Sequence, residues 1–389
     1  MSLRYLTAGE SHGKGLTAIL EGFPSNVAVL KDEIDVQLKR RQGGYGRCGR
    51  MKIESDGVEI VGGVRHGLSL GSPIALWIEN KDFRAWTDEM AAEPLAGFVS
   101  KKLVEKPRPG HADLTGGIKY DQRDLRNILE RASARETTAR VAVGAICRKL
   151  LAEFGIEVAG HVINIGGVKI STERPDVATI AKLQESDPCR CIDANISAQM
   201  RTKIDEAKKK GDTVGGVFEI VFIGLPIGLG SHVQWDRKLD ARLAATMLSI
   251  QAIKGVEFGM GFETANCFGS EVHDPIHYDS PNKRFYHGRN NAGGLIGGMT
   301  DGEPIVIRGV MKPISTLYTP LPSVNIATKE PFEASIERSD TCAVPAASVI
   351  AENVLCFDIA NALIEKFGGD SLGEMKKNFA AYAEFVHGY

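Results

Sequence analysis

The sequence predicts a single α+β domain that spans residues 1–389. Segments typical of strands and of helices alternate without a regular βαβ period, and neither a Pro/Ser-rich linker nor an internal repeat divides the chain. Glycine accounts for 43 of the 389 residues, well above its usual share of about 7%. Glycines clustered in pairs are typical of closely packed sheets or of loops that lie against a ligand.

Strands are predicted where short runs rich in β-branched residues are bounded by glycine or proline. Six segments fit this pattern: Leu3–Thr7, Leu16–Leu20, Val58–Val64, Ile74–Ile78, Gly216–Ile223 and Pro304–Val310.

Helices are predicted where apolar residues recur every three or four positions. The clearest pattern runs from Arg123 to Phe154, and Gly155 would end that helix. Four further segments are predicted to be helical: Asp32–Arg41, Ser197–Lys210, Asp236–Ile250 and Ala346–Phe367.

Composition argues against several classes of protein. The formal net charge is −2 and the pI is about 6.5, so we expect no nucleic-acid-binding domain. The longest apolar stretch, Ile220–Gly230, is interrupted by Pro226 and is too short to span a bilayer. The first residues lack the apolar core of a signal peptide, and seven scattered cysteines do not suggest a disulfide framework. We therefore expect a cytoplasmic protein.

An arginine-rich loop follows the predicted helix Asp32–Arg41. Gly44–Gly49 matches the GxGxxG pattern, but that pattern marks a dinucleotide site only where it follows a strand, so we do not predict one. Four arginines lie in or beside the loop: Arg40, Arg41, Arg47 and Arg50. The local pattern fits either an exposed basic loop or a site for anions.

A second basic segment, Lys106–Asp113, contains Arg108 and His111, and its two prolines restrict the backbone. Arg131 and Arg135 follow in the long predicted helix, four residues apart. Like charges at this spacing repel each other. We expect either an anion bound between the two guanidinium groups or two side chains that point apart into water.

Two later segments each allow a structural and a functional interpretation. Lys312–Thr316 follows a predicted strand, and its ammonium group, hydroxyls and backbone N–H groups would suit a phosphate, although an ordinary loop would look the same. Asp340 precedes the last predicted helix and could simply begin it.

Histidine spacing does not predict a metal site. His273 and His277 have HxxxH spacing, but Pro275 lies between them and no third ligand accompanies the pair. Ser11 and His12 are neighbours in a glycine-rich turn, a relation that does not by itself create nucleophile–base geometry.

Taken together and in order, these segments resemble the chorismate synthase family. The matching motifs are Gly9–Gly13, Arg40–Arg47 continuing to Arg50–Met51, Arg108–Asp113, Arg131–Thr137, Gln251–Gly255, Gly293–Gly298, Lys312–Thr316 and Glu337–Pro345. Two positions depart from many members, which have His where Ser339 stands and Arg where Ala346 stands. Both departures resemble the longer, Gram-positive-like subgroup.

The resemblance implies a single α+β domain with helices sandwiched between antiparallel sheets, assembled as a homotetramer. It implies 1,4-anti-elimination of phosphate from 5-enolpyruvylshikimate 3-phosphate, which gives chorismate and needs reduced FMN without net redox change. A separate flavin reductase is the expected partner. The alternative is a bifunctional form that also reduces FMN with NADPH, for which Arg41 and Arg47 occupy the inferred contact positions.

The resemblance also assigns roles to residues. His12 would protonate the leaving phosphate, His111 would protonate reduced flavin near N1, and Asp340 would relay the proton at flavin N5. The substrate-binding positions are Ser11, Arg47, Arg50, Arg108, Arg135 and Arg338. The flavin-binding positions are Arg131, Ala132, Ser133, Gln251, Ala252, Gly297, Lys312, Pro313, Ile314, Ser315, Thr316 and Arg338.

Overall fold

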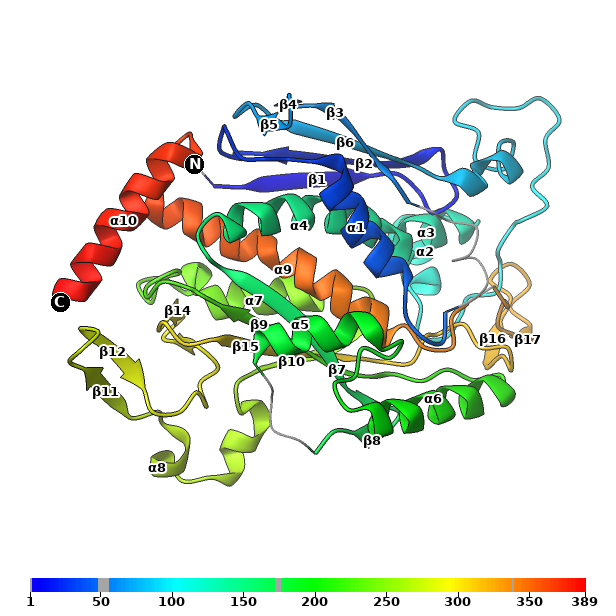
Figure 1. Cartoon of the computed structure of the whole chain (residues 1–389). Helices are drawn as coiled ribbons and strands as arrows, with labels where there is room; N and C mark the ends of the chain where they lie inside the picture. The colour runs from blue at the N-terminus through cyan, green and yellow to red at the C-terminus, as the bar shows by residue number, and fades with distance from the viewer. Residues whose placement is uncertain (1, 48–55, 172–175, 338) are drawn as a thin grey trace.

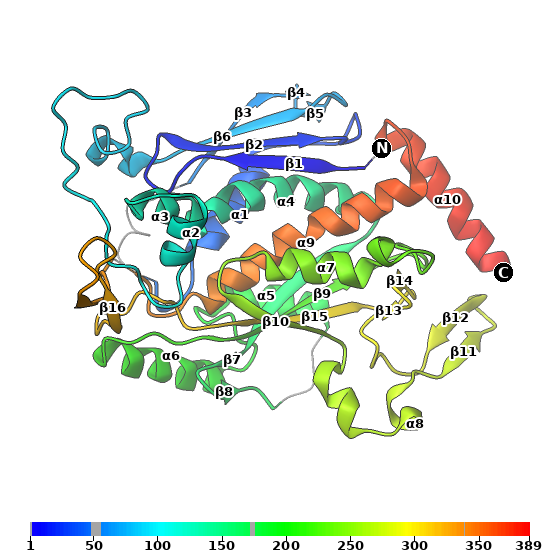
Figure 2. The same cartoon turned by 180° about the vertical axis from the view of Figure 1, so that it is seen from behind.

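A layer of helices lies between two antiparallel sheets in the computed structural model, which describes residues 2–47, 56–171, 176–337 and 339–389 (Figure 1). The same layers are visible from behind in Figure 2. The predicted α+β class with sandwiched helices is confirmed.

The first sheet has the strand order β1-β2-β6-β3 and is antiparallel throughout. Its strands are β1 (Arg4–Ala8), β2 (Gly15–Glu21), β3 (Val58–Gly62) and β6 (Ile74–Glu79). Apolar side chains of β2 and β6 alternate toward the core, as in a sheet with one covered face.

The second sheet has the order β10-β15-β9-β7-β8 and is also antiparallel. Its strands are β7 (Glu157–Ile165), β8 (Val168–Lys169), β9 (Gly216–Ile223), β10 (Ile253–Phe258) and β15 (Ile305–Met311). All six predicted strands are confirmed, whereas β7 and β10 were not predicted. Gly160 and Gly255 interrupt these two sequences and weaken the strand pattern.

Four helices form the central layer: α1 (Lys31–Gln42), α4 (Thr137–Ala152), α7 (Leu239–Leu248) and α9 (Val344–Phe367). α4 packs against the first sheet, α9 packs against β7 and β9 of the second, and the two helices pack against each other. α9 is long and apolar enough to cross a membrane by length and composition, but 89% of that window is buried inside the protein. It is therefore the core helix of the fold.

Shorter elements surround this frame. The peripheral helices are α2 (Asp113–Lys119), α3 (Arg126–Ala132), α5 (Val177–Ser186), α6 (Ala194–Lys209), α8 (Gly269–Val272) and α10 (Leu372–Gly388), and the 3₁₀ turns are η2 (Lys81–Ala85), η3 (Ala134–Glu136), η4 (Trp235–Arg237) and η5 (Gly261–Asn266). The hairpins are β4 (Val64–Arg65) with β5 (Leu68–Ser69), β11 (Ile276–Asp279) with β12 (Arg284–His287), β13 (Leu295–Ile296) with β14 (Met299–Thr300), and β16 (Pro322–Val324) with β17 (Pro331–Glu333).

The long helix predicted from Arg123 to Phe154 is wrong as a continuous element. Ser133 has extended backbone angles, φ −61° and ψ 143°, and its hydroxyl accepts a hydrogen bond from the backbone N–H of Arg135. A serine side chain that bonds to nearby backbone groups competes with the helix in this way. Arg131 and Arg135 therefore do not share a helical face, so the helical spacing on which both expectations for this pair depended is wrong.

Glu352 forms ion pairs that connect the elements of the central layer. Its carboxylate is fully buried in α9 and pairs with Arg40 at 2.8 Å, Arg148 at 3.1 Å and Arg190 at 2.5 Å. Burial alone would raise the pKa of Glu352, but the three guanidinium groups outweigh it and lower the pKa to about 2.

Asp358, less than two turns further along α9, has the opposite environment. Burial raises its pKa to about 6, an effect that Thr246 and Arg242 offset only in part. Its Oδ2 atom has no hydrogen-bond partner among the described residues. This carboxyl group therefore stays protonated to a higher pH in the folded protein than a free Asp side chain does.

We predict that Asp358→Asn removes a pH-dependent loss of stability. The folded pKa of Asp358 is about 6, whereas an unfolded Asp titrates near pH 3.9. The folded state therefore binds more protons between these values, and the free energy of unfolding falls as the pH rises from about 4 to 6. The loss at pH 7 is about 3 kcal/mol in wild type and absent in the variant.

Urea denaturation from pH 4 to pH 7 measures this difference. The exposed Asp236 provides the control, and Asp236→Asn should follow the wild-type curve. Parallel pH dependence of Asp358→Asn and wild type would contradict the prediction.

Candidate active site

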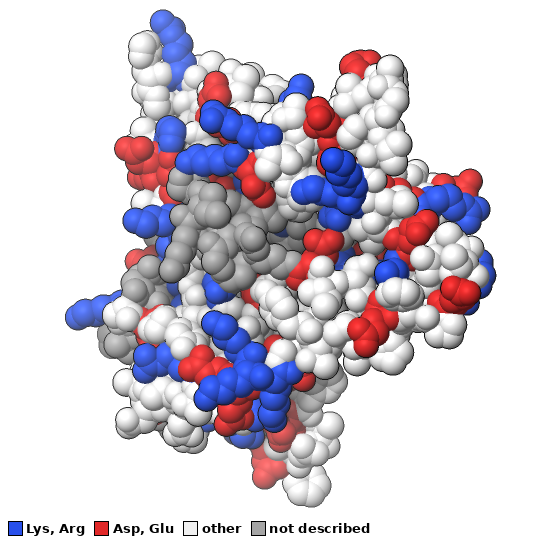
Figure 3. Space-filling view, turned by 90° about the vertical axis from the view of Figure 1, so that its right-hand side faces the viewer, with Lys and Arg blue, Asp and Glu red and all other residues white. Residues whose placement is uncertain are grey.

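Segments that are far apart in sequence meet at one end of the sandwich, at the right of Figure 1. Hydrogen bonds link five segments there: the β1–β2 loop, the loop before α2, the segment from α3 to η3, the loop after β15 and the segment before α9. Figure 3 views this end directly, and Lys and Arg side chains gather on it, interspersed with Asp and Glu. An end of this kind can bind anions.

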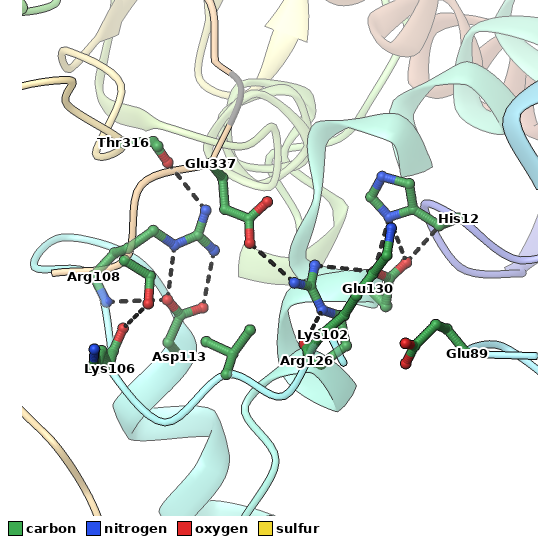
Figure 4. A network of polar contacts seen from close by, with 12 residues as sticks. His12, Glu89, Lys102, Lys106, Arg108, Asp113, Arg126, Glu130, Thr316 and Glu337 are labelled. Atoms are coloured by element: carbon green, nitrogen blue, oxygen red, sulfur yellow. Dashed lines mark hydrogen bonds and ion pairs between the residues drawn. The ribbon is translucent and has the colours of Figure 1, made fainter. Parts of the chain in front are cut away.

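His12 lies in the β1–β2 loop and is 9% exposed. Its Nδ1 atom is 2.8 Å from Oε1 of Glu130, and its backbone N–H donates to Oε2 of the same carboxylate at 2.8 Å (Figure 4). The imidazole stacks on the indole of Trp86, with ring centroids 3.9 Å apart. The ring is therefore held both at one nitrogen and on one face.

The end of α3 binds the same loop. Ser133 donates to the hydroxyl of Ser11 at 3.1 Å, and Arg131 donates to the carbonyl oxygens of Thr7 and Gly9 at 2.8 and 3.1 Å. The structure thus brings the predicted substrate residue Ser11 beside the predicted flavin residues Arg131, Ala132 and Ser133.

Arg135 is buried, and a carboxylate holds it. It donates to Asp56 at 2.7 Å and to the side-chain oxygen of Asn80 at 2.9 Å. Asn80 in turn donates to the carbonyl oxygen of Gly13, which connects Arg135 to the β1–β2 loop. Arg41 is 4% exposed, lies 3.8 Å from Asp56 and donates to Thr137 at 2.9 Å.

Arg108, His111 and Asp113 form a second cluster before α2, part of which is drawn in Figure 4. Arg108 donates to Asp113 at 2.9 Å and to the hydroxyl of Thr316 at 3.0 Å. Nδ1 of His111 is 2.5 Å from Asp113. Burial alone would raise the pKa of Asp113, but the hydrogen bonds from His111 and Arg108 hold it well below its usual range.

The protonation of His111 follows from these contacts. Two groups contact Nδ1 of His111: the carboxylate of Asp113 at 2.5 Å, which only accepts hydrogen bonds, and the guanidinium of Arg108 at 3.0 Å, which only donates. The shorter contact with Asp113 favours a proton on Nδ1. The other ring nitrogen, Nε2, is then the one that can exchange a proton with a ligand.

The loop after β15 meets the turn before β10. Lys312 donates through its backbone N–H to the carbonyl oxygen of Ala252 at 2.9 Å and through its ammonium group to that of Gly110. Burial and the nearby Lys254 lower the pKa of Lys312. Oε1 of Gln251 is buried without a hydrogen-bond partner among the described residues. The ammonium groups of Lys312 and Lys254 and the unpaired oxygen of Gln251 suit a ligand that has both a negative charge and a hydrogen-bond donor.

Ala252 adopts φ +68°, a left-handed conformation that is uncommon for residues other than glycine. Such conformations cluster at ligand sites, where the surrounding structure holds them. This turn places Gln251 and Ala252 beside Lys312, the first residue of the predicted Lys312, Pro313, Ile314, Ser315 and Thr316 segment.

Gly297 lies apart from the other predicted flavin residues. It is in the β13–β14 hairpin, before the first residue of β15, whereas Lys312 follows the last residue of that strand. A seven-residue strand is about 20 Å long. Arg50 and Arg338 lie outside the described residues.

Asp340 is not a helix-start residue. α9 begins at Val344, and its N-cap is Ala343, so the capping interpretation of Asp340 is wrong. Its carboxylate instead accepts a hydrogen bond from Arg47 at 2.7 Å, and both side chains are largely buried. The segment before α9 is thereby joined to the arginine-rich loop after α1.

A groove of about 640 Å³ opens between the His12 and Arg108 clusters, and sequence reasoning missed it. Its cations are Lys101, Lys102, Lys106 and Arg126, and its aromatic residues are Trp86 and Phe332. The ammonium groups of Lys102 and Lys106 lie 3.3 Å from the ring centroids of Trp86 and Phe332, respectively. No motif marks these residues, because the groove forms only where two distant loops meet.

Comparisons with known proteins show the family to which the chain belongs. The family model described as chorismate synthase matches residues 3–364. The chain is 56% identical to "Chorismate synthase 1" of Bacillus cereus and 55% identical to "Chorismate synthase" of Geobacter sulfurreducens, covering 100% of each chain. It resembles a solved "Crystal Structure of Chorismate Synthase" with a TM-score of 0.81 and 45% identity, over 100% of this chain and 99% of that one. On sequence and fold together, the chain belongs to the chorismate synthase family.

Proposed function

We propose that the protein converts 5-enolpyruvylshikimate 3-phosphate to chorismate by 1,4-anti-elimination of phosphate, with reduced FMN as cofactor. The observation that carries this proposal is that two histidines held by carboxylates, His12 and His111, belong to loops at the same cation-rich end of the molecule. Family membership supports the reaction class.

The substrate carries one phosphate and two carboxylates, so its site must supply several cations. Arg47, Arg108 and Arg135 are each held by a carboxylate, at 2.7, 2.9 and 2.7 Å. These partners compensate the buried charges before the substrate arrives and hold each guanidinium in a fixed orientation. We assign substrate binding to these three arginines and to Ser11, Arg50 and Arg338.

The cluster around Lys312 fits FMN. Lys312 and Lys254 provide cations for a phosphate, Ser315 and Thr316 provide hydroxyls, and Gln251 offers a buried acceptor for an N–H donor. When bound, reduced FMN supplies the electron density that makes loss of phosphate from C3 and of hydrogen from C6 feasible. We assign Arg131, Ala132 and Ser133, at the end of α3, to the same ligand, and Gly297 is the assigned residue that lies apart from the others in the described chain.

Three side chains move protons in this proposal. His12 gives a proton to the departing phosphate, and His111, held at Nδ1 by Asp113, exchanges a proton with the cofactor through Nε2. Asp340 accepts and relays a proton beside Arg47. General acid–base help of this kind contributes about 10²–10⁴-fold to a rate.

We also propose that reduced FMN comes from a separate reductase. In the bifunctional alternative, Arg41 and Arg47 would contact NADPH. In this structure Arg41 is almost fully buried and donates to Thr137 and to the backbone of Ala134. This environment favours a structural role for Arg41 and supports the monofunctional form.

Assembly as a homotetramer is the third part of the proposal. Large apolar side chains are exposed at the end opposite the site, among them Phe262 and Phe268 at 80% and Ile276 at 69%. Phe285 of β12 also contacts Tyr389 at the end of α10. Exposed apolar surface on this scale is typical of protein interfaces.

We predict that purified protein releases phosphate and forms chorismate only with reduced FMN. An anaerobic assay compares reduced FMN, oxidised FMN, and oxidised FMN with NADPH. Equal turnover with oxidised FMN alone would falsify the cofactor role. Turnover with oxidised FMN and NADPH, without added reductase, would show the bifunctional form instead.

Asp340→Asn should slow proton transfer while leaving the fold intact. Asn is nearly the same size and still accepts a hydrogen bond from Arg47, but an amide cannot accept a proton, so kcat should fall by about tenfold or more. Single-turnover rates, substrate Kd and melting temperature measure the effect. Glu330→Gln, at an exposed carboxylate, is the control. Rates within a factor of two of wild type would remove Asp340 from the mechanism.

Replacing the exposed apolar side chains should dissociate the assembly. Phe268→Ser with Ile276→Ser removes apolar area that an interface would bury, so the molar mass in light scattering should fall below that of four chains. Val99→Ser changes an equally exposed residue in a different loop and should leave the mass unchanged. A monomeric wild-type protein would contradict the proposed tetramer.

A further inference from the structure

One carboxylate from α3 contacts both the backbone N–H and the ring of His12. The backbone N–H of His12 donates to Oε2 of Glu130 at 2.8 Å, and Nδ1 lies 2.8 Å from Oε1 (Figure 4). The backbone of Glu130 takes part as well, because its carbonyl oxygen accepts from the N–H of Ser11 at 3.0 Å. Glu130 therefore fixes the loop and the ring together.

This carboxylate is deeply buried. The Glu130 side chain is 2% exposed, and that of His12 is 11% exposed. Arg126, one helical turn earlier, approaches Glu130 at 3.7 Å and is itself bonded to Glu337 at 3.0 Å. A buried carboxylate needs compensating partners. The carboxylate of Glu130 contacts His12 at 2.8–3.1 Å, closer than it approaches Arg126.

Trp86 fixes the plane of the same ring. The indole and the imidazole are stacked, with an angle of 24° between their planes, and the ammonium group of Lys102 lies 3.3 Å from the indole centroid. Stacking restricts tilting of the imidazole, and the carboxylate restricts its rotation. Figure 4 shows the second ring nitrogen on the side away from Glu130.

We propose that Glu130 is a positioning residue for His12: it keeps a proton on Nδ1 and directs Nε2 toward the phosphate that leaves. Because an ionised carboxylate only accepts hydrogen bonds, a neutral His12 beside it must carry its proton on Nδ1. The inference rests on the proposed function, in which His12 is the acid.

Protons and electrons balance in this step. The imidazolium of His12 carries protons on both nitrogens. As the bond between C3 and the phosphate oxygen breaks, its electron pair stays on that oxygen, which takes the proton from Nε2. In the complete 1,4-elimination the electron pair of the C6–H bond that is lost makes up the deficit at C3. The ring is left neutral with Nδ1–H still bonded to Glu130, and a proton from solvent restores the imidazolium before the next turnover.

The main test is a double-mutant cycle between Glu130 and His12. The amide of Glu130→Gln has one accepting oxygen, so it cannot accept from both N–H donors of His12 in the geometry that the carboxylate uses. We expect kcat to fall by about 10–100-fold and KM to change much less, since the acid is misplaced while the arginines remain. In the His12→Ala background, Glu130→Gln should lower kcat further by less than about twofold.

Two further variants separate positioning from general structure. Glu130→Asp keeps the charge on a shorter side chain and should recover part of the lost kcat. Glu89→Gln changes a nearby carboxylate that bonds to Ser100, and its kcat should equal that of wild type. Melting temperatures of all variants show whether each protein is folded.

A second measurement does not depend on turnover. Solid-state NMR of protein labelled with ¹⁵N-histidine reports which ring nitrogen carries the proton, and the His12 signals are those lost in His12→Ala. We expect Nδ1–H in the neutral ring of wild type and a mixture of the two neutral forms in Glu130→Gln.

Two results would overturn the inference: an equal loss of kcat from Glu130→Gln in both backgrounds, or Nε2–H in the neutral ring of wild type. If wild type does not turn over the substrate with reduced FMN, the proposed function fails. The NMR measurement then still decides whether Glu130 controls the proton on His12.

Discussion

The burial of α9 on every side is the constraint on which the architecture depends. A helix that is apolar around its whole circumference cannot face water, so it needs partners in all directions. α4, α7 and the second sheet supply them, and α4 in turn is covered by the first sheet. Glu352 adds a second requirement, because a charge at this depth must be paired. Arg40 of α1, Arg148 of α4 and Arg190 of the segment before α6 meet that requirement.

The same pairing positions the loops of the candidate site. Arg40 is in the last turn of α1, immediately before the loop that carries Arg47. That loop is bonded to the segment before α9 through the carbonyl oxygen of Gly46, which accepts from Thr341 and Cys342, and through Arg47 with Asp340. The frame of helices thus reaches the site through backbone and side-chain contacts, which is how rigid elements hold functional loops in place.

Carboxylates are repeatedly the partners of residues to which we assign a role in substrate binding or proton transfer. Asp56 holds Arg135, Asp113 holds Arg108 and His111, and Glu130 holds His12. Each is buried and orients a cation or an imidazole without being exposed itself. A site for a substrate with several negative charges concentrates positive charge, and internal carboxylates make such a concentration tolerable within the fold.

The sequence alone determined much of the frame of helices and strands, and it determined which chemical groups the candidate site contains. Periodic apolar patterns predicted α1, α6, α7, α9 and six strands, because burial of one face leaves a local trace in sequence. Motif residues such as His12, Arg108 and Lys312 were found for a similar reason, since residue type and near neighbours carry their chemistry. Together these patterns also indicated the family.

Only the tertiary structure decided which groups act on one another. Glu130 is 118 positions from His12, Arg47 is 293 positions from Asp340, and Arg108 is 208 positions from Thr316. The break at Ser133, which periodicity did not reveal, separated Arg131 from Arg135 and gave each a different partner. Local patterns record the burial and conformation of a segment. The partner of a buried charge is instead set by the packing of distant segments, which no window of neighbouring residues contains.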